Sequence, residues 1–96
     1  MTKEDIKSIL WANKEVLNRY RVKSIALFGS YVRNEQRQDS DIDFLVEFTD
    51  NTYDNFINLI FSLEELFKKS VTVVGETDLS PYIKPYVLKE MEKIEG

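Results

Sequence analysis

The sequence predicts a small α/β (α+β) fold in which a short mixed sheet of about three or more strands is flanked by three main helices. Two apolar runs, residues 22–28 and 70–74, each stop at a glycine, as buried strands that end in a tight turn do. A third run, residues 41–48, alternates apolar and polar residues like a strand with one buried face. With 96 residues, 43% of them hydrophobic, the chain is expected to form one domain, residues 1–96, around one core.

Three other segments have the apolar periodicity of amphipathic helices. In the first, Thr2 and Asp5 are spaced as a capping box, and the stripe is Ile6, Ile9, Leu10, Val16, Leu17 and Tyr20. The second has the stripe Phe56, Leu59, Ile60, Leu63, Leu66 and Phe67. In the third, Ser80 is expected as N-cap and Pro81 as first helical residue. Its stripe is Ile83, Val87, Leu88, Met91 and Ile94.

The composition restricts the chemistry. The chain has no cysteine and no histidine, which removes disulfides, thiolate nucleophiles, imidazole bases and the usual zinc ligands. A metal ion would be held by oxygen, which favours Mg²⁺, Mn²⁺ or Ca²⁺. With 13 basic and 17 acidic residues the net charge is -4, so binding to long nucleic acid is not expected. Without a long apolar run or a signal-peptide core, we expect a cytoplasmic protein that does not bind membranes.

The chemically informative unit is Gly29-Ser30 at the end of the first strand, followed after ten residues by Asp41-Ile42-Asp43. A glycine lets backbone approach a phosphate closely, and the Ser30 hydroxyl with amides at a helix start can bind phosphate oxygens. Asp41 and Asp43 leave the same face of a strand with their roots roughly 6.6 Å apart. Two carboxylates, triphosphate oxygens and water suit octahedral Mg²⁺. Either half alone is more often a plain turn or a solvated strand face, but together they predict a Mg-nucleotide site.

The segments 29–34 and 39–46 resemble the central motif of the DNA polymerase beta-like nucleotidyltransferases. The similarity is greatest to the minimal nucleotidyltransferase (MNT) subgroup, and it extends to the third strand and to residues 79–88. The resemblance implies the small nucleotidyltransferase fold, with Gly29 and Ser30 gripping the terminal phosphates of ATP.

The same resemblance makes Asp41 and Asp43 the catalytic pair, which would ligate Mg²⁺ or Mn²⁺. Arg33 and Ser40 belong to the motif and are predicted as further nucleotide-binding residues. For Arg33, pairing with an acidic neighbour is the alternative.

The reaction implied is transfer of a nucleoside monophosphate, AMP in the case of ATP, to an acceptor hydroxyl while pyrophosphate leaves. Many minimal members are antitoxins paired with a helical HEPN toxin, and some inactivate it by adenylylating a tyrosine. The resemblance therefore implies an antitoxin whose partner is a HEPN-type toxin or another acceptor chain. A chain of 96 residues leaves nothing over for an acceptor-binding domain. We expect a hetero-complex held by exposed apolar or aromatic residues of the helices, with a homo-oligomer as the alternative.

Thr72 departs from the family pattern. The family places there a third carboxylate, which binds the catalytic metal and helps to deprotonate the acceptor hydroxyl, whereas threonine supplies neither charge nor basicity. Glu47 lies roughly 13 Å along the strand from Asp43, too far to replace it, and the sequence does not fix where Glu76 points. Three alternatives are open: a slow enzyme, an enzyme whose acceptor or partner supplies the base, and a nucleotide-binding antitoxin subunit that acts by partner binding alone. A domain with no nucleotide site is the remaining interpretation.

Smaller features carry weaker expectations. Asn34 stands where the family usually has glycine, and asparagine tolerates the left-handed conformation. Tyr31 is expected to stack on a ligand or face solvent. Lys68-Lys69 are interpreted as a helix end, and Arg37 as a solvent-exposed loop residue with a nucleotide contact as the alternative.

Overall fold

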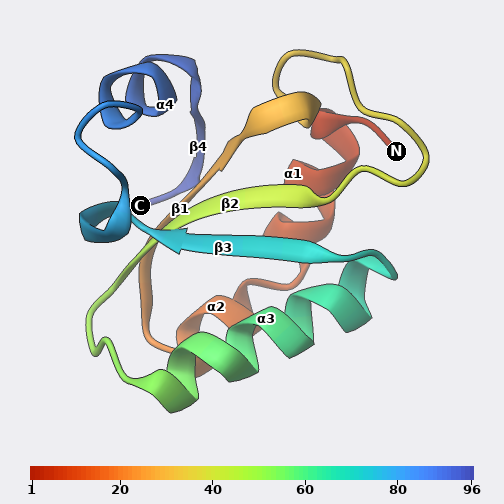
Figure 1. Cartoon of the computed structure of the whole chain (residues 1–96). Helices are drawn as coiled ribbons and strands as arrows, with labels where there is room; N and C mark the ends of the chain where they lie inside the picture. The colour runs from red at the N-terminus through yellow and green to blue at the C-terminus, as the bar shows by residue number, and fades with distance from the viewer.

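A four-stranded mixed sheet organises the computed structural model, which describes all 96 residues (Figure 1). Its strand order is β3-β2-β1-β4. β1 (Val22–Phe28) pairs antiparallel with β2 (Ile42–Phe48) and with β4 (Glu92–Glu95), while β2 pairs parallel with β3 (Val71–Gly75). The predicted mixed α/β architecture is confirmed, and the sheet has one strand more than the three that the sequence pattern located.

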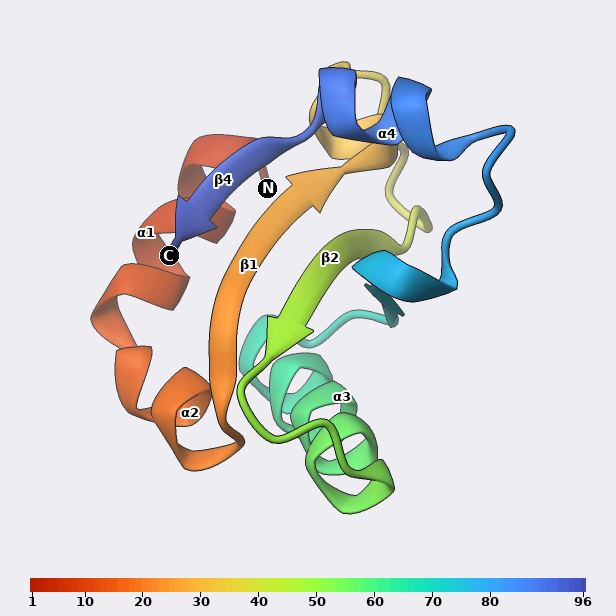
Figure 2. The same ribbon diagram turned by 90° about the vertical axis from the view of Figure 1, so that its left-hand side faces the viewer.

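Helices cover both faces of the sheet. α1 (Lys3–Ala12), α2 (Lys14–Arg19) and α3 (Tyr53–Phe67) pack on one face, and α4 (Lys84–Glu90) packs on the other. The rotated view shows α4 next to the turn that follows β1 (Figure 2). No helix has both the length and the apolar character that a membrane span requires.

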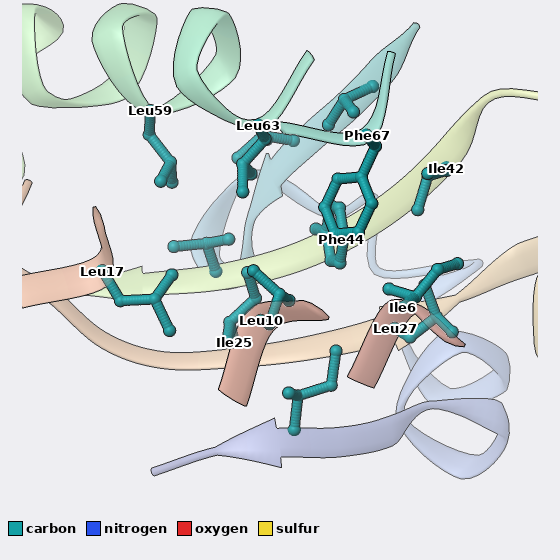
Figure 3. Packing of buried hydrophobic residues seen from close by; sticks show 14 of the residues in the cluster. Ile6, Leu10, Leu17, Ile25, Leu27, Ile42, Phe44, Leu59, Leu63 and Phe67 are labelled. Carbon is teal, nitrogen blue, oxygen red and sulfur yellow. The ribbon is translucent and has the colours of Figure 1, made fainter. Parts of the chain in front are cut away.

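The larger hydrophobic core lies between the sheet and the first three helices. It is built from the helix stripes predicted above and from the inward residues of the strands. Figure 3 shows side chains of α1 and α3 facing those of β1 and β2, namely Ile6, Leu10, Leu59, Leu63, Phe67, Ile25, Leu27, Ile42 and Phe44. A smaller core on the opposite face joins α4 to the sheet through Ala26, Leu45 and Val87.

The alternation predicted for β2 decides where the acidic pair lies. Ile42 and Phe44 are fully buried in the larger core, and Leu45 belongs to the smaller one. Because successive side chains of a strand point to opposite faces, Asp43 shares the face of Leu45 and α4. Ile42 and Phe44 therefore fix one face of β2 against the larger core, and Asp43 lies on the opposite face.

The first predicted helix is in fact two helices that meet at Asn13. The Thr2/Asp5 capping box is confirmed at the start of α1, but Asn13 has φ -129° and serves both as C-cap of α1 and N-cap of α2. Its side-chain amide donates to the carbonyl of Ile9 at 2.7 Å. Asparagine competes with the backbone for hydrogen bonds and breaks the helix here, which an apolar stripe alone does not reveal.

The expectation for the last helix was wrong at both ends. Ser80 and Pro81 are not its N-cap and first residue: residues 81–83 form a turn, and the helix begins at Lys84 with Pro85 in its first turn. At the other end Met91 is extended, with φ -58° and ψ 149°, and Ile94 is buried in β4 against the larger core. Ile94 follows Met91 by three residues. This spacing fits one more turn of a helix, so the sequence pattern does not distinguish a continued helix from this short strand.

Candidate active site

Gly29-Ser30 and Asp43 lie side by side at one end of the sheet. Gly29 and Ser30 open η1 (Gly29–Tyr31), a 3₁₀ turn directly after β1, and the register of β1 with β2 pairs Phe28 with Asp43. Tyr31 is buried in the larger core, contrary to the expectation of a stacking or solvent-facing ring, and it anchors the turn. The β1–β2 pairing thus brings the phosphate-binding half of the predicted motif to the carboxylate half.

Gly29 is required at its position for two reasons. Its φ of +80° is in the left-handed region that side chains disfavour. In addition, a Cβ built on Gly29 would lie 2.2 Å from Oδ2 of Asp43, well inside van der Waals contact. The missing side chain therefore lets the Asp43 carboxylate pack directly against the backbone of the turn, in space that any other residue would fill.

Asp41 and Asp43 have no partner within the chain. Neither side chain takes part in a salt bridge or a hydrogen bond. Partial burial, and then repulsion from Asp41, raises the pKa of Asp43 above its ordinary value. Glu90 adds to this rise and Arg33 opposes it. The site therefore holds negative charge that the protein itself leaves uncompensated.

These oxygen donors could hold a divalent cation together with a nucleotide. No group of three or more Asp, Glu, His or Cys side chains is arranged to hold a metal ion, so phosphate and water oxygens would complete the shell around the Asp41/Asp43 pair. This division of ligands is the one that Mg²⁺ ordinarily has in nucleotide sites. The uncompensated carboxylates, one of them packed against the Gly29 backbone, fit such a ligand.

Arg33 forms the internal pairing that was one of its two predicted roles. Its Nε donates to Oε1 of Glu35 at 2.7 Å, and its Nη1 donates to a carboxylate oxygen of Glu90. These two carboxylates raise the pKa of the guanidinium. No pattern in the sequence indicates Glu90 as the partner, because the contact joins the loop after η1 to the end of α4, 57 residues away. The ion pair ties α4 to the turn that begins with Gly29 and Ser30.

The two serines predicted to bind nucleotide differ in whether their hydroxyls already have a partner in the chain. Ser30 is half-buried and its hydroxyl has no hydrogen-bond partner in the chain, whereas Oγ of Ser40 accepts from the backbone N–H of Arg37 at 2.8 Å and closes the loop before Asp41. Asn34 has φ 59°, which confirms that asparagine serves there in the left-handed conformation.

Thr72 lies directly beside Asp43, since the two residues are partners in the parallel β2–β3 register. Its side chain is exposed. Glu76 follows four residues later in η2 (Glu76–Asp78), at the far end of the strand and roughly 13 Å away along it. It lines a hollow with Glu47 rather than with Asp43. β3 itself contains no Asp or Glu, so the strand supplies no third carboxylate to the pair.

The family of the chain follows from comparison with known proteins. A model described as Nucleotidyltransferase domain matches residues 9–94. The chain belongs to this family, and the resemblance found in the Gly29-Ser30 and Asp41/Asp43 motif is confirmed.

Individual relatives are similar over nearly their whole length. The chain is 43% identical over 96 residues to MJ1379 of Methanocaldococcus jannaschii, provisionally named a protein adenylyltransferase, and covers 93% of it with 96% of its own length. It is 42% identical over 93 residues to the protein adenylyltransferase MntA of Thermococcus cleftensis, with 95% of this chain and 94% of that protein covered.

Solved structures share the fold. One, provisionally described as a minimal nucleotidyltransferase, has a TM-score of 0.82 at 32% identity, covering 96% of this chain and 95% of that chain. Another contains a tri-AMPylated Shewanella oneidensis HEPN toxin in complex with an MNT antitoxin. Its matched chain has a TM-score of 0.67 at 21% identity, covering 92% of this chain and 70% of that one.

We predict that Gly29→Ala weakens Mg-ATP binding by at least about tenfold, because about 1.4 kcal/mol is a factor of ten and the new methyl group must displace the Asp43 carboxylate. Isothermal titration calorimetry measures this. Gly75→Ala is the matched control, since Gly75 has φ -74° and its Cβ would meet only the movable end of Asp78. Equal affinity of both variants would contradict the account of Gly29.

Asp43→Asn is predicted to stabilise the fold near neutral pH. A carboxyl whose pKa is raised on folding binds its proton more tightly in the folded state, so its contribution to stability falls as pH rises from the ordinary value of 3.8 through the raised one. Asparagine does not ionise, and we expect a gain of about 0.5 kcal/mol or more.

Urea unfolding across a pH series checks this prediction. The gain should vanish once the pH is below the ordinary Asp value, where both states are protonated. Asp50→Asn, an exposed change outside the site, is the control and should give no comparable gain. A loss of stability in Asp43→Asn at neutral pH is the contrary result.

Proposed function

We propose that the chain is a protein adenylyltransferase that binds Mg-ATP and transfers AMP to a tyrosine hydroxyl of a HEPN-type toxin, and so acts as an antitoxin. The observation that carries the proposal is the uncompensated Asp41/Asp43 pair, of which Asp43 packs against the Gly29 backbone. Such a pair is unfavourable for folding, as the raised pKa of Asp43 indicates, and is explained by a cationic ligand. Relatives of similar length named as protein adenylyltransferases support the same activity.

Each residue has a defined part in this reaction. Gly29 and Ser30 bind the β- and γ-phosphates through backbone and hydroxyl groups, and Asp41 and Asp43 would hold the divalent ions. These ions would neutralise charge on the reacting phosphate. The acceptor oxygen bonds to the α-phosphorus while the bond from that phosphorus to the oxygen of the β-phosphate breaks. AMP-modified acceptor, pyrophosphate and one proton result.

The partner is proposed from the surface and from the relatives. Large hydrophobic side chains remain exposed on the helices and the turn before α4, which suits a protein interface. They are Trp11, Tyr53, Phe61, Tyr82, Ile83 and Tyr86. One chain of the Shewanella complex of an MNT antitoxin with an AMPylated HEPN toxin shares the fold of this chain, and the complex supports a HEPN-type toxin as the partner. Self-association is the alternative use of these side chains.

A second candidate function rests on Thr72. Because the residue beside Asp43 is neutral and exposed, the chain has no internal group to accept the hydroxyl proton. A nucleotide-binding antitoxin that neutralises its toxin by contact would need no such group. In the enzyme we propose, the base comes from the acceptor chain or from solvent, and turnover is slow.

Labelled-phosphate transfer distinguishes these functions. The purified chain is incubated with Mg²⁺, ATP labelled at the α-phosphate and a lysate of the source organism. We expect label on one protein with the wild type and none with Asp41→Asn/Asp43→Asn. We expect Thr72→Asp to accelerate transfer about 10²-fold or more, since a positioned base contributes about 10²–10⁴.

The control for the added charge is Thr77→Asp, an exposed position in η2, which should leave the rate unchanged. Label absent from the wild type and gained with Thr72→Asp would establish the contact-only antitoxin instead. Label absent from both would overturn the adenylyltransferase proposal.

A further inference from the structure

A polar hollow of about 370 Å³ lies at the end of the sheet where β2 and β3 begin. Two connections border this open hollow, one before β2 and one between α3 and β3, and Figure 1 shows both at this end. Its walls are Gln38, Asp39, Ser40, Lys68, Lys69 and Ser70. The hollow adjoins the carboxylate pair, because the backbone N–H of Ile42, next to Asp41, donates to the carbonyl of Ser70 at 3.1 Å.

Hydrogen bonds hold the two walls in place. Nζ of Lys69 donates to the carbonyl of Gln38 at 2.8 Å and ties the walls together. Lys68 ends α3 in the left-handed conformation, with its N–H bonded to the carbonyl of Glu64 at 2.8 Å. A second hollow shares Gln38 and Lys69 with the first and adds Arg37 to its lining. The basic side chains therefore line an organised surface and are more than the helix end that the sequence indicated.

The cations of this surface are unpaired. Arg37, Lys68 and Lys69 form no salt bridge, whereas Arg33, on the other side of the carboxylate pair, is held by two carboxylates. Asp39 is the one carboxylate in the lining of the two hollows. Three cations against one carboxylate make a local positive excess in a chain whose net charge is -4. Such an excess beside a site attracts and orients anionic partners.

The sheet order tells which ligand arrives on this side. Gly29 and Ser30 follow β1 and Ser70 precedes β3, so the two groups flank β2 from opposite sides. Under the proposed function the phosphates lie on the Gly29 side. The acceptor hydroxyl then approaches over the exposed Thr72 on the β3 side, next to the hollow lined by Lys68 and Lys69.

We propose that Arg37, Lys68 and Lys69 bind an acidic segment of the acceptor protein that flanks the hydroxyl to be modified. The inference rests on the proposed function for the direction from which the acceptor comes. It adds the chemical class of the substrate: a hydroxyl-bearing side chain with Asp or Glu close to it in the acceptor. Salt weakens this recognition, because exposed charges are screened.

Two fluorescein-labelled peptides test the proposal, one with a tyrosine flanked by glutamates and one with a tyrosine flanked by lysines. Fluorescence anisotropy measures their binding to the intact chain at low and high salt. We expect the wild type to bind the glutamate peptide at least about tenfold more tightly, with the difference shrinking in high salt. Lys68→Glu/Lys69→Glu should abolish the preference. It should leave Mg-ATP affinity within about twofold, because the two lysines and the residues proposed to bind the nucleotide form separate sites.

Lys84→Glu/Lys89→Glu is the matched control, because it makes the same charge change on two α4 lysines without salt bridges and should keep the preference. Circular dichroism verifies that the variants are folded. The proposal is overturned if the wild type shows no preference or binds neither peptide. It is also overturned if Lys68→Glu/Lys69→Glu weakens Mg-ATP binding while the preference persists, since the hollow would then be a phosphate subsite. Peptide binding does not require transfer, so failure of the proposed function would appear separately, as absence of labelled product.

Discussion

The approach of the Asp43 carboxylate to the backbone of Gly29 is the constraint on which the site depends. A single methyl group at Gly29 would lie 2.2 Å from that carboxylate. The left-handed turn at the end of β1 and the carboxylate at position 43 are therefore compatible only if residue 29 is glycine. The contact is set by the β1–β2 register, in which Phe28 faces Asp43. That register is in turn fixed by Ile42 and Phe44 in the larger core, because a shift by one residue would exchange the faces of β2.

Charge is distributed unevenly around this contact. Arg33 is the cation on the Gly29 side, and it is occupied by Glu35 and Glu90. The carboxylate pair has no ion-pair partner, and partial burial followed by repulsion from Asp41 raises the pKa of Asp43. Cations without salt bridges lie next to the start of β3. A site arranged in this way gives up some folding stability and keeps its negative charge available for a ligand, as functional sites commonly do.

The sequence predicts those parts of the molecule that local patterns determine. The three strands that begin at Val22, Ile42 and Val71 have apolar patterns that a few consecutive residues reveal. The capping box at Thr2 is recognisable from four residues, Thr2 to Asp5. The motif around Gly29 and Asp43 was also recognisable, because strand periodicity places both acids on one face. Thr72 was assigned from the sequence to the third-carboxylate position of the family, and the parallel register places it beside Asp43.

What the sequence could not predict depends on contacts between distant segments. β4 is a four-residue strand that exists through pairing with β1 and burial of Ile94, and nothing local separates it from a continued helix. The same holds for Glu90, which reaches Arg33 across 57 residues. The basic hollow likewise forms from two connections that are far apart in the chain. Asn13 is a different case, because its side chain breaks a helix whose apolar stripe continues.

Calorimetric titration of ATP, with Mg²⁺ and with excess chelator, tests the central claim most directly. The account predicts binding that requires Mg²⁺ and that weakens by at least about tenfold, or about 1.4 kcal/mol, in Asp41→Asn/Asp43→Asn while the variant remains folded. Binding of equal strength without the metal, or in the variant, would contradict the claim that the uncompensated pair beside Gly29 holds the nucleotide.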